Sequence, residues 1–322
     1  MESVEKLIAF NNMVRQSILK TLHYFDLVQF PLTKEELFAY LWQPSDVDFG
    51  DFLTVLADLE QQKAIEQKCG YYFLSGNEKS VAWRRERLLV TEKKMRIAMR
   101  AAKKIRSVPF LKAIFVCNTV GAEQSVEDSD IDFLIITHPK RIWIVRFLTN
   151  FILRLWRLRT YGKRIKNRIC LSFYLDAHHL SLSNYRIAED DIHLAYWLYQ
   201  MLPIYDPGNL YPKFLQANSW SRKFLPNLEK RPVFTERLIV ADSKLGHTWK
   251  RIWEKMWGGI YGDIIEKQSR LIQWMKLKSE IKNKVNRGDK GVIISDGIIK
   301  FHEQDARANY RQEWMKRTQK FG

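Results

Sequence analysis

Hydrophobic residues in the middle of the chain follow two kinds of spacing, and together these predict an α/β fold. Three runs of mostly apolar residues, at 111–117, 130–137 and 168–176, have the length and composition of buried strands. Between the second and third runs, residues 141–159 place their apolar side chains on one side of a helix. We therefore expect residues 91–185 to form one α/β domain.

Helical spacing of apolar residues dominates the first ninety residues. It extends over 4–25, resumes after a capping box at 33–36, and recurs over 49–62. Short apolar runs on either side of Gly70 then predict a β-hairpin. Three helices and a hairpin are the elements of a winged helix, so residues 1–90 are predicted to form a winged-helix-like domain.

The third of these helices is the candidate recognition helix, and its charge argues against DNA binding. It carries Asp48, Asp51, Asp58 and Glu60 against a single Lys63. Acidic side chains are repelled by the phosphate backbone of DNA. The domain is therefore expected to contact protein or to be structural, with a winged-helix DNA-binding regulator kept as an alternative.

Beyond the last apolar run the pattern becomes helical again. Helical spacing at 187–201 is followed by a turn at 206–209 and then by aromatic-rich, basic helices. Glycines at 288 and 291 interrupt this pattern. We expect a helical domain over 186–287 and a C-terminal tail over 288–322.

The composition indicates a folded protein of the cytoplasm. Of its 322 residues, 46% are hydrophobic, enough to bury the cores of two or three compact units. The isolated Cys69, Cys117 and Cys170 fit a reducing compartment better than a disulfide framework. The N-terminus has no basic segment followed by an apolar run, as a signal peptide would. Arginines interrupt the apolar stretch at 141–159, so no transmembrane segment is predicted.

The chain is strongly basic, with a formal net charge of +17 and an isoelectric point near 9.7. A field of this sign attracts nucleic acid, nucleotide phosphates or an anionic membrane surface. The charge is concentrated at 141–168, where nine Lys and Arg occur without an acidic residue. This stretch is expected to pack on the sheet with a solvated basic face. Contact with phosphate or RNA is an alternative, and so is interfacial membrane binding.

Two carboxylates stand at the start of the second apolar run. Asp130 and Asp132 are two residues apart in a predicted strand, so both project from one face, about 7 Å from each other. Like charges this close repel unless a cation lies between them. Mg²⁺, a hard cation with oxygen ligands, is the usual solution, and it often brings phosphates with it. The alternative is that both side chains cap a solvated strand end.

The residues upstream strengthen the metal interpretation. The strand at 111–117 is followed by the small and polar residues 118–122, and Asp130 comes about ten residues later. This order resembles the signature of the DNA polymerase beta-like nucleotidyltransferase superfamily. There a strand ends in Gly-Ser or Gly-Gly, a helical turn follows, and an Asp-hydrophobic-Asp motif comes after it. In this chain Asn118-Thr119 stands where Gly-Ser is usual.

The resemblance implies a fold, a site and an activity. The fold would be a mixed sheet with flanking helices. Asp130 and Asp132 would hold Mg²⁺ or Mn²⁺, and Asn118, Thr119 and Ser129 would contact the phosphates of an NTP substrate. A nucleoside monophosphate would pass to an unidentified hydroxyl acceptor, for which the basic charge favours RNA or another polyanion. A non-catalytic nucleotide- or RNA-binding protein on the same fold is the first alternative.

The superfamily also carries a third carboxylate on a later strand. The corresponding strand here is the run at 168–176, whose only acidic residue is Asp176 at its far end. The positions nearer Ser172, where the carboxylate is expected, are not acidic. Asp176 is therefore the candidate third catalytic carboxylate, and a turn residue at the end of a strand is the alternative.

Overall fold

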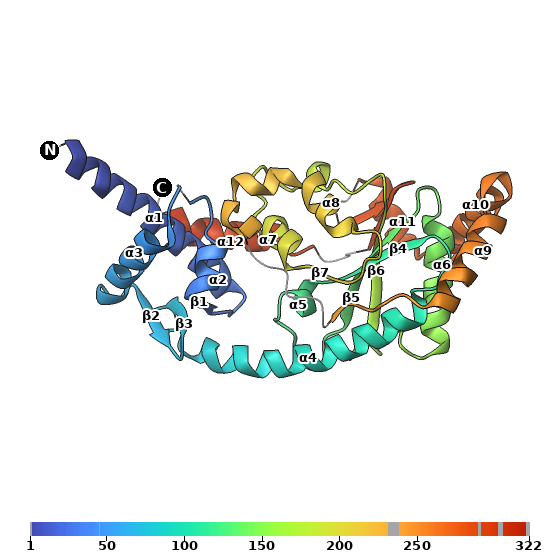
Figure 1. Ribbon diagram of the computed structural model, residues 1–322, viewed down its shortest axis with the longest axis horizontal. Coiled ribbons are helices and arrows are strands. Elements are labelled where there is room, and N and C mark those ends of the chain that lie inside the picture. The colour runs from blue at the N-terminus through green and yellow to red at the C-terminus, as the bar shows by residue number, and fades with distance from the viewer. Residues whose placement is uncertain (1, 45, 231–237, 289–290, 302–304, 320–322) are drawn as a thin grey trace.

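The computed structural model describes the chain except for residues 1, 45, 231–237, 289–290, 302–304 and 320–322. It is a mixed α/β structure with an elongated outline (Figure 1). The N-terminal helices lie at one end, a six-stranded sheet lies toward the middle, and α9 and α10 form the other end (Figure 1). Within the described residues, no helix combines the length and the apolar composition needed to cross a bilayer.

The N-terminal elements are three helices and a small antiparallel sheet with the strand order β1-β3-β2. In chain order they are α1 (Glu2–Leu27), β1 (Leu32–Thr33), α2 (Lys34–Ala39), α3 (Phe49–Gln61), β2 (Ile65–Lys68) and β3 (Tyr71–Leu74). The predicted capping box is present at the start of α2. The Thr33 hydroxyl accepts from the backbone N–H of Glu36 at 3.2 Å, and the Glu36 carboxylate accepts from the N–H of Thr33 at 2.9 Å.

The core of these elements continues into later parts of the chain. Helix α1 packs against α7 (Ile192–Gln200) and α12 (Arg307–Thr318) within one hydrophobic cluster. The rings of Tyr24 and Tyr196 stack with centroids 4.5 Å apart, and the Trp314 indole donates to the carbonyl of Lys20 at 2.9 Å. The N-terminal helices therefore bury their apolar faces partly on segments more than a hundred residues away.

The large sheet is mixed and has the strand order β7-β4-β5-β6-β9-β8. Its strands are β4 (Leu111–Cys117), β5 (Ile131–Thr137), β6 (Ile169–Asp176), β7 (Leu202–Tyr205), β8 (Val292–Ile294) and β9 (Ile298–Phe301). Strands β5 and β6 are parallel, and the other neighbouring pairs are antiparallel. Helix α4 (Lys79–Ile105) leads into β4, the single turn α5 (Asn118–Gly121) follows it, and α6 (Ile142–Leu155) connects β5 to β6.

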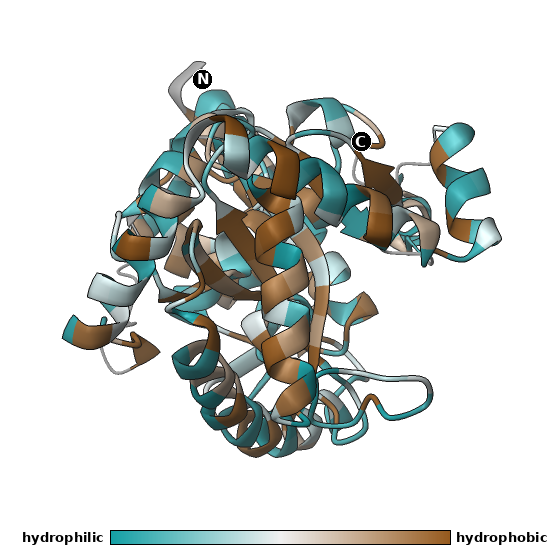
Figure 2. Ribbon diagram, turned by 90° about the vertical axis from the view of Figure 1, so that its right-hand side faces the viewer, coloured by the Kyte–Doolittle hydropathy of each residue, from teal (hydrophilic) through white to brown (hydrophobic). Residues whose placement is uncertain are grey.

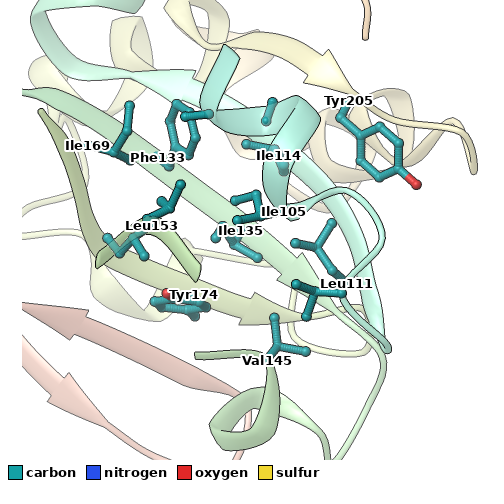
Figure 3. Packing of buried hydrophobic residues seen from close by; sticks show 14 of the residues in the cluster. Ile105, Leu111, Ile114, Phe133, Ile135, Val145, Leu153, Ile169, Tyr174 and Tyr205 are labelled. Atoms are coloured by element: carbon teal, nitrogen blue, oxygen red, sulfur yellow. The ribbon is translucent and has the colours of Figure 1, made fainter. Parts of the chain in front are cut away.

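Both faces of this sheet are covered (Figure 2). Ile131, Phe133 and Ile135 of β5 face α4 and α6, and Figure 3 shows this layer. Leu134 and Ile136 point to the opposite face, where α7 and α8 (Leu210–Ala217) pack. The side-chain alternation of β5 therefore places Asp132 on the α7 side.

Three strands lie where the sequence predicts helices or a tail. β7 falls within the region predicted to be helical, and β8 and β9 fall within the predicted C-terminal tail. Each is a short apolar run, and such a run is compatible with either a strand or a helix until its neighbouring strand is known. Pro203 suits β7 because β7 is an edge strand, where a missing N–H is tolerated.

The remaining helices of the described residues lie in the second half of the chain. They are η1 (Ser183–Tyr185), η2 (Ser219–Lys223), η3 (Pro226–Lys230), α9 (Lys244–Met256), α10 (Gly259–Met275) and α11 (Ser279–Asn286). Among them, α10 packs against α6 and α11 packs against β8. Helix α12 then returns to the N-terminal helices and packs against α1 (Figure 1).

Candidate functional site

Two carboxylates and a thiol converge where β5 and β6 begin. Asp130 immediately precedes β5, and Asp132 is paired with Cys117 of β4 on one side and with Cys170 of β6 on the other. Ligand atoms of Asp130, Asp132 and Cys170 all lie within 4.8 Å of one another. The mixed sheet therefore brings side chains from two strands to one point.

The environment of Asp132 disfavours its negative charge. Burial is the main cause that raises its pKa from 3.8 to about 6, and the nearby charge of Asp130 adds to it. Hydrogen bonds from neighbouring side chains oppose this rise, including one from the Ser172 hydroxyl at 3.5 Å. A cation between the two carboxylates would relieve the repulsion. Asp130 and Asp132 are therefore the described residues here that could hold a cation.

The chemistry of the ligands fits a hard divalent cation held by the carboxylates. Oxygen ligands suit Mg²⁺ and Mn²⁺, whereas a thiol suits softer metals. Burial raises the pKa of the Cys170 thiol, so it remains protonated at neutral pH. Asp130 and Asp132 would therefore supply the protein ligands for Mg²⁺, with Cys170 beside them as a neutral side chain.

The turn α5 lies beside these carboxylates and begins at Asn118. Asn118 has a φ of 54°, a left-handed conformation that Asn adopts more readily than most residues and that Gly adopts freely. The Asn118 side-chain oxygen accepts from the indole N–H of Trp197 at 2.7 Å, which fixes its orientation. Thr119 is exposed and follows directly. The backbone conformation at Asn118 is therefore one that Gly would also adopt without strain.

Gly121 allows α5 to approach its neighbours closely. A Cβ atom at this position would lie 2.7 Å from the carbonyl oxygen of Gln200 and 2.9 Å from that of Val116. Both neighbours are backbone atoms, which cannot move aside alone. Gly121 is thus required for the packing of α5 on β4 and α7.

Ser129 belongs to a turn that a buried lysine holds in place. Its hydroxyl donates to the carbonyl of Val126 at 3.0 Å. Lys94 of α4, which is fully buried, donates to the carbonyls of Ser129 and Glu127 and to the side-chain oxygen of Asn167. Lys94 therefore fixes the loop that ends at Asp130. Sequence reasoning missed it because it is one of many basic residues in α4.

Asp176 does not join the other two carboxylates. It pairs with Thr137 at the far end of β5, six residues along β6 from Cys170, a separation of roughly 20 Å at about 3.3 Å per residue. Its carboxylate accepts from the backbone N–H of His178 at 2.8 Å and contacts the His179 ring at 2.7 Å. The parallel register thus separates Asp176 from Asp130 and Asp132, so the structure does not bring the three predicted carboxylates into one site. Cys170 and Ser172 occupy the positions beside Asp132.

A cavity of about 300 Å³ opens next to Asn118 and Thr119. Its lining is mainly apolar and comes from α1, α7, β6, β9 and the start of α12. Aromatic side chains form much of it: Tyr24, Phe173, Tyr185, Trp197 and Tyr310. A cavity of this size and lining suits a planar or apolar group.

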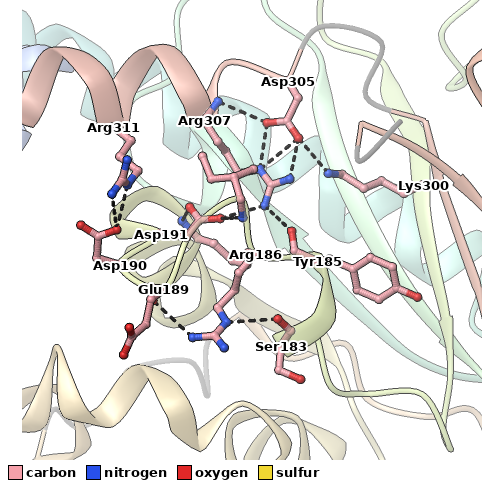
Figure 4. A network of polar contacts seen from close by, with 12 residues as sticks. Ser183, Tyr185, Arg186, Glu189, Asp190, Asp191, Lys300, Asp305, Arg307 and Arg311 are labelled. Carbon is pink, nitrogen blue, oxygen red and sulfur yellow. Dashed lines mark hydrogen bonds and ion pairs between the residues drawn. The ribbon is translucent and has the colours of Figure 1, made fainter. Parts of the chain in front are cut away.

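Charged residues at one wall of this cavity are paired with one another (Figure 4). Arg307 donates to Asp191 at 3.0 Å, to Asp305 at 2.7 Å and to the carbonyl of Tyr185 at 3.0 Å. Lys300 donates to Asp305 at 3.2 Å. The network joins β9 and α12 to the start of α7. It fixes the geometry of this wall.

Comparison of the chain with models of protein families, with curated proteins and with solved structures finds no match in any of the three. The chemistry of the site described above therefore carries the functional argument.

Proposed function

We propose that the chain is a metal-dependent nucleotidyltransferase that transfers a nucleoside monophosphate from an NTP to a hydroxyl acceptor. The observation that carries the proposal is the convergence of Asp130 and Asp132 beside the turn that begins with Asn118-Thr119. A strand, a short helical turn and an Asp-x-Asp strand in this order resemble the DNA polymerase beta-like superfamily. The mixed sheet around them supports the same proposal.

Each group would have a distinct role in the transfer. Asp130 and Asp132 would hold Mg²⁺ or Mn²⁺, which neutralises triphosphate charge when bound. Thr119, exposed beside this position, would contact the phosphates. The acceptor hydroxyl would form a bond to the α-phosphorus while the bond to pyrophosphate breaks, and its proton would pass to water.

The cavity and the net charge each indicate a different feature of the proposed substrates. The aromatic cavity beside Thr119 suits a nucleoside or a small acceptor. The net charge of +17 supports RNA or another polyanion as acceptor. The compartment is proposed to be the cytoplasm.

The N-terminal elements support a winged-helix domain that contacts protein. Their order and the β1-β3-β2 sheet fit that fold. On α3, Asp51, Asp58 and Glu60 are exposed, and Asp58 pairs with Arg15 of α1. An acidic outer face disfavours contact with DNA phosphates.

A second candidate function is nucleotide binding without transfer. The observation that favours it is the occupation of the β6 positions beside Asp132 by Cys170 and Ser172. Neither side chain is a carboxylate, so the site would lack the usual third acidic group. Such a protein would bind Mg-nucleotide and release it unchanged.

Incubation with each α-³²P-labelled NTP and Mg²⁺ or Mn²⁺ tests the first proposal. Total RNA, total protein and a small-molecule extract would be offered separately as acceptors. Transfer by the wild type that Asp130→Asn abolishes and Asp128→Asn preserves would support it. Asp128 is the matched control because it lies in the same loop with its side chain 87% exposed. Transfer that survives Asp130→Asn would refute it.

Cys170→Asp separates the two candidates. Its carboxylate would lie beside Asp130 and Asp132, since the Cys170 thiol already lies within 4.8 Å of both. If the wild type binds Mg-nucleotide without transfer and Cys170→Asp gains transfer, the native site is a binding site. If the wild type transfers label both with Mg²⁺ and with Mn²⁺, the enzyme proposal stands.

A further inference from the structure

Helix α9 turns two charged side chains inward and a stripe of apolar side chains outward. Lys250 is buried and donates to the carbonyl of Leu111, and the Glu254 carboxylate accepts from the N–H of Phe110 at 2.7 Å. On the opposite side, Leu245 is 85% exposed and Trp249, Ile252 and Met256 are each more than half exposed. An ordinary surface helix of a globular protein has the reverse arrangement.

Helix α10 has the same inverted arrangement. The Glu266 carboxylate accepts from the N–H groups of Trp143 and Ile144 at the start of α6, and Gln273 donates to the Trp143 carbonyl at 2.9 Å. The outward residues are apolar and occur at helical spacing: Ile260, Ile264, Leu271 and Met275. Ile260 is 82% exposed. Two successive helices thus contact the protein through buried polar groups as well as through Trp257 and Ile265, and each leaves a row of apolar side chains uncovered.

We call these eight residues, four on α9 and four on α10, the outer apolar stripe. Helices α9 and α10 form one end of the molecule (Figure 1), and Figure 2 looks onto that end. Each helix thus exposes four large apolar side chains along one face, and exposed apolar patches mark interaction surfaces.

The charge around the outer apolar stripe identifies the chemistry of its partner. Residues 244–287 contain eleven Lys and Arg against four Asp and Glu. Three of the four acidic residues are engaged by the protein: Glu254 and Glu266 accept backbone N–H groups, and Asp263 pairs with Arg141 at 2.6 Å. The exposed charge of this segment is therefore predominantly positive.

Exposed basic residues flank the stripe on both helices: Lys244, Arg251, Lys255, Lys267 and Lys276. A helix with an apolar face, Lys and Arg beside it, and Trp among the apolar residues is typical of peripheral membrane binding. Aromatic residues such as Trp249 favour the boundary between headgroups and acyl chains. A second copy of the chain is a poorer partner, because each copy carries a net charge of +17.

We propose that the outer apolar stripe of α9 and α10 is a membrane-binding surface that lies in the interface of a bilayer rich in anionic phospholipid. The apolar side chains enter the boundary of the acyl chains, and the flanking Lys and Arg contact the headgroup phosphates. The interaction is peripheral. It is independent of the proposed transferase activity.

Vesicle co-sedimentation with the full chain tests the proposal. The probes are vesicles of phosphatidylcholine alone and vesicles that also contain phosphatidylglycerol. The test variant replaces Leu245, Trp249, Ile252 and Met256 with Gln. The matched control replaces Val4, Leu7 and Ile8 with Gln, because these residues of α1 are also more than half exposed and lie at the other end of the molecule (Figure 1).

The wild type and the α1 control are expected to bind the anionic vesicles. The affinity of the α9 variant for them is expected to be lower by at least about ten-fold. Circular dichroism would verify that each variant keeps its helical content. Equal binding by the α9 variant would overturn the proposal, since charge alone would then account for the interaction. Failure of the wild type to bind would overturn it as well. Sedimentation velocity without lipid tests whether the stripe instead joins two copies. A wild-type dimer that is absent in the α9 variant would show this and would overturn the proposal.

Discussion

Replacing Asp132 by Asn is predicted to stabilise the metal-free protein at neutral and alkaline pH. Burial and the charge of Asp130 raise the pKa of Asp132 from 3.8 to about 6, so ionising this side chain in the folded protein is unfavourable. At 1.36 kcal/mol per pKa unit, the ionised form costs about 3 kcal/mol, which solvent access and relaxation reduce to about 1–3 kcal/mol. Asn removes the charge and keeps an oxygen that can accept from Ser172.

The pH dependence of this effect has a definite sign. The pKa of Asp132 is higher in the folded than in the unfolded protein, so the folded protein binds more protons between about pH 4 and pH 6. The contribution of Asp132 to stability therefore falls as the pH rises through this window. Wild type and Asp132→Asn are expected to have similar stability near pH 4 and to differ by about 1–3 kcal/mol near pH 8.

Urea unfolding in the presence of EDTA, followed by tryptophan fluorescence, measures this difference. Asp128→Asn is the matched control, because Asp128 lies in the same loop and is largely exposed, and its effect should stay within about 0.5 kcal/mol. Added Mg²⁺ should stabilise the wild type and leave Asp132→Asn unchanged. If Asp132→Asn instead destabilises the metal-free protein near pH 8, fixed protein donors stabilise the carboxylate, and the reasoning for a cation there fails.

Three further predictions concern other parts of the molecule. Arg307→Met removes the ion-pair partner of the buried Asp191 and should lower the free energy of unfolding by about 3–5 kcal/mol. Arg311→Met, whose ion pair is more exposed, should cost about 1 kcal/mol or less, and equal losses in urea unfolding would contradict the role of the network. Gly121→Ala should displace α5, lowering both the thermal midpoint and the affinity for Mg-ATP in calorimetric titration; unchanged values would show that the backbone there can relax. The exposed Cys69 should be alkylated near pH 8 at least about ten-fold faster than Cys170, because burial raises the pKa of the Cys170 thiol. Mass spectrometry of the peptides measures both rates, and comparable rates would contradict the burial of Cys170.

Local patterns in the sequence determined β4, β5 and β6 of the large sheet and the neighbourhood of the carboxylates. The predicted run at 111–117 coincides with β4, and those at 130–137 and 168–176 each begin one residue before β5 and β6. The alternation of β5 also placed Asp130 and Asp132 on the face opposite Phe133. These features follow from the period of a strand and the length of an apolar run, both of which are local.

Strand pairing was decided only by the tertiary structure. A run of three or four apolar residues has no definite period, so β7, β8 and β9 acquire their identity from the strands beside them. Register also decides which ends of strands meet. The parallel pairing of β5 with β6 sets Cys170 against Asp132 and leaves Asp176 at the far end, and a list of acidic residues contains no such information.

Burial was likewise outside the reach of local patterns. Lys94 and Lys250 read as solvent-exposed charges in basic helices, yet each is buried and donates to backbone carbonyls of a distant segment. The stripe of apolar residues on α9 would be assigned to a core by its helical spacing, yet it faces outward. Periodicity shows that a helix has two different faces. The tertiary contacts decide which face turns toward the protein: on α9, Lys250 and Glu254 bond to backbone groups of a distant segment, and Trp257 at its C-terminal end packs on the core.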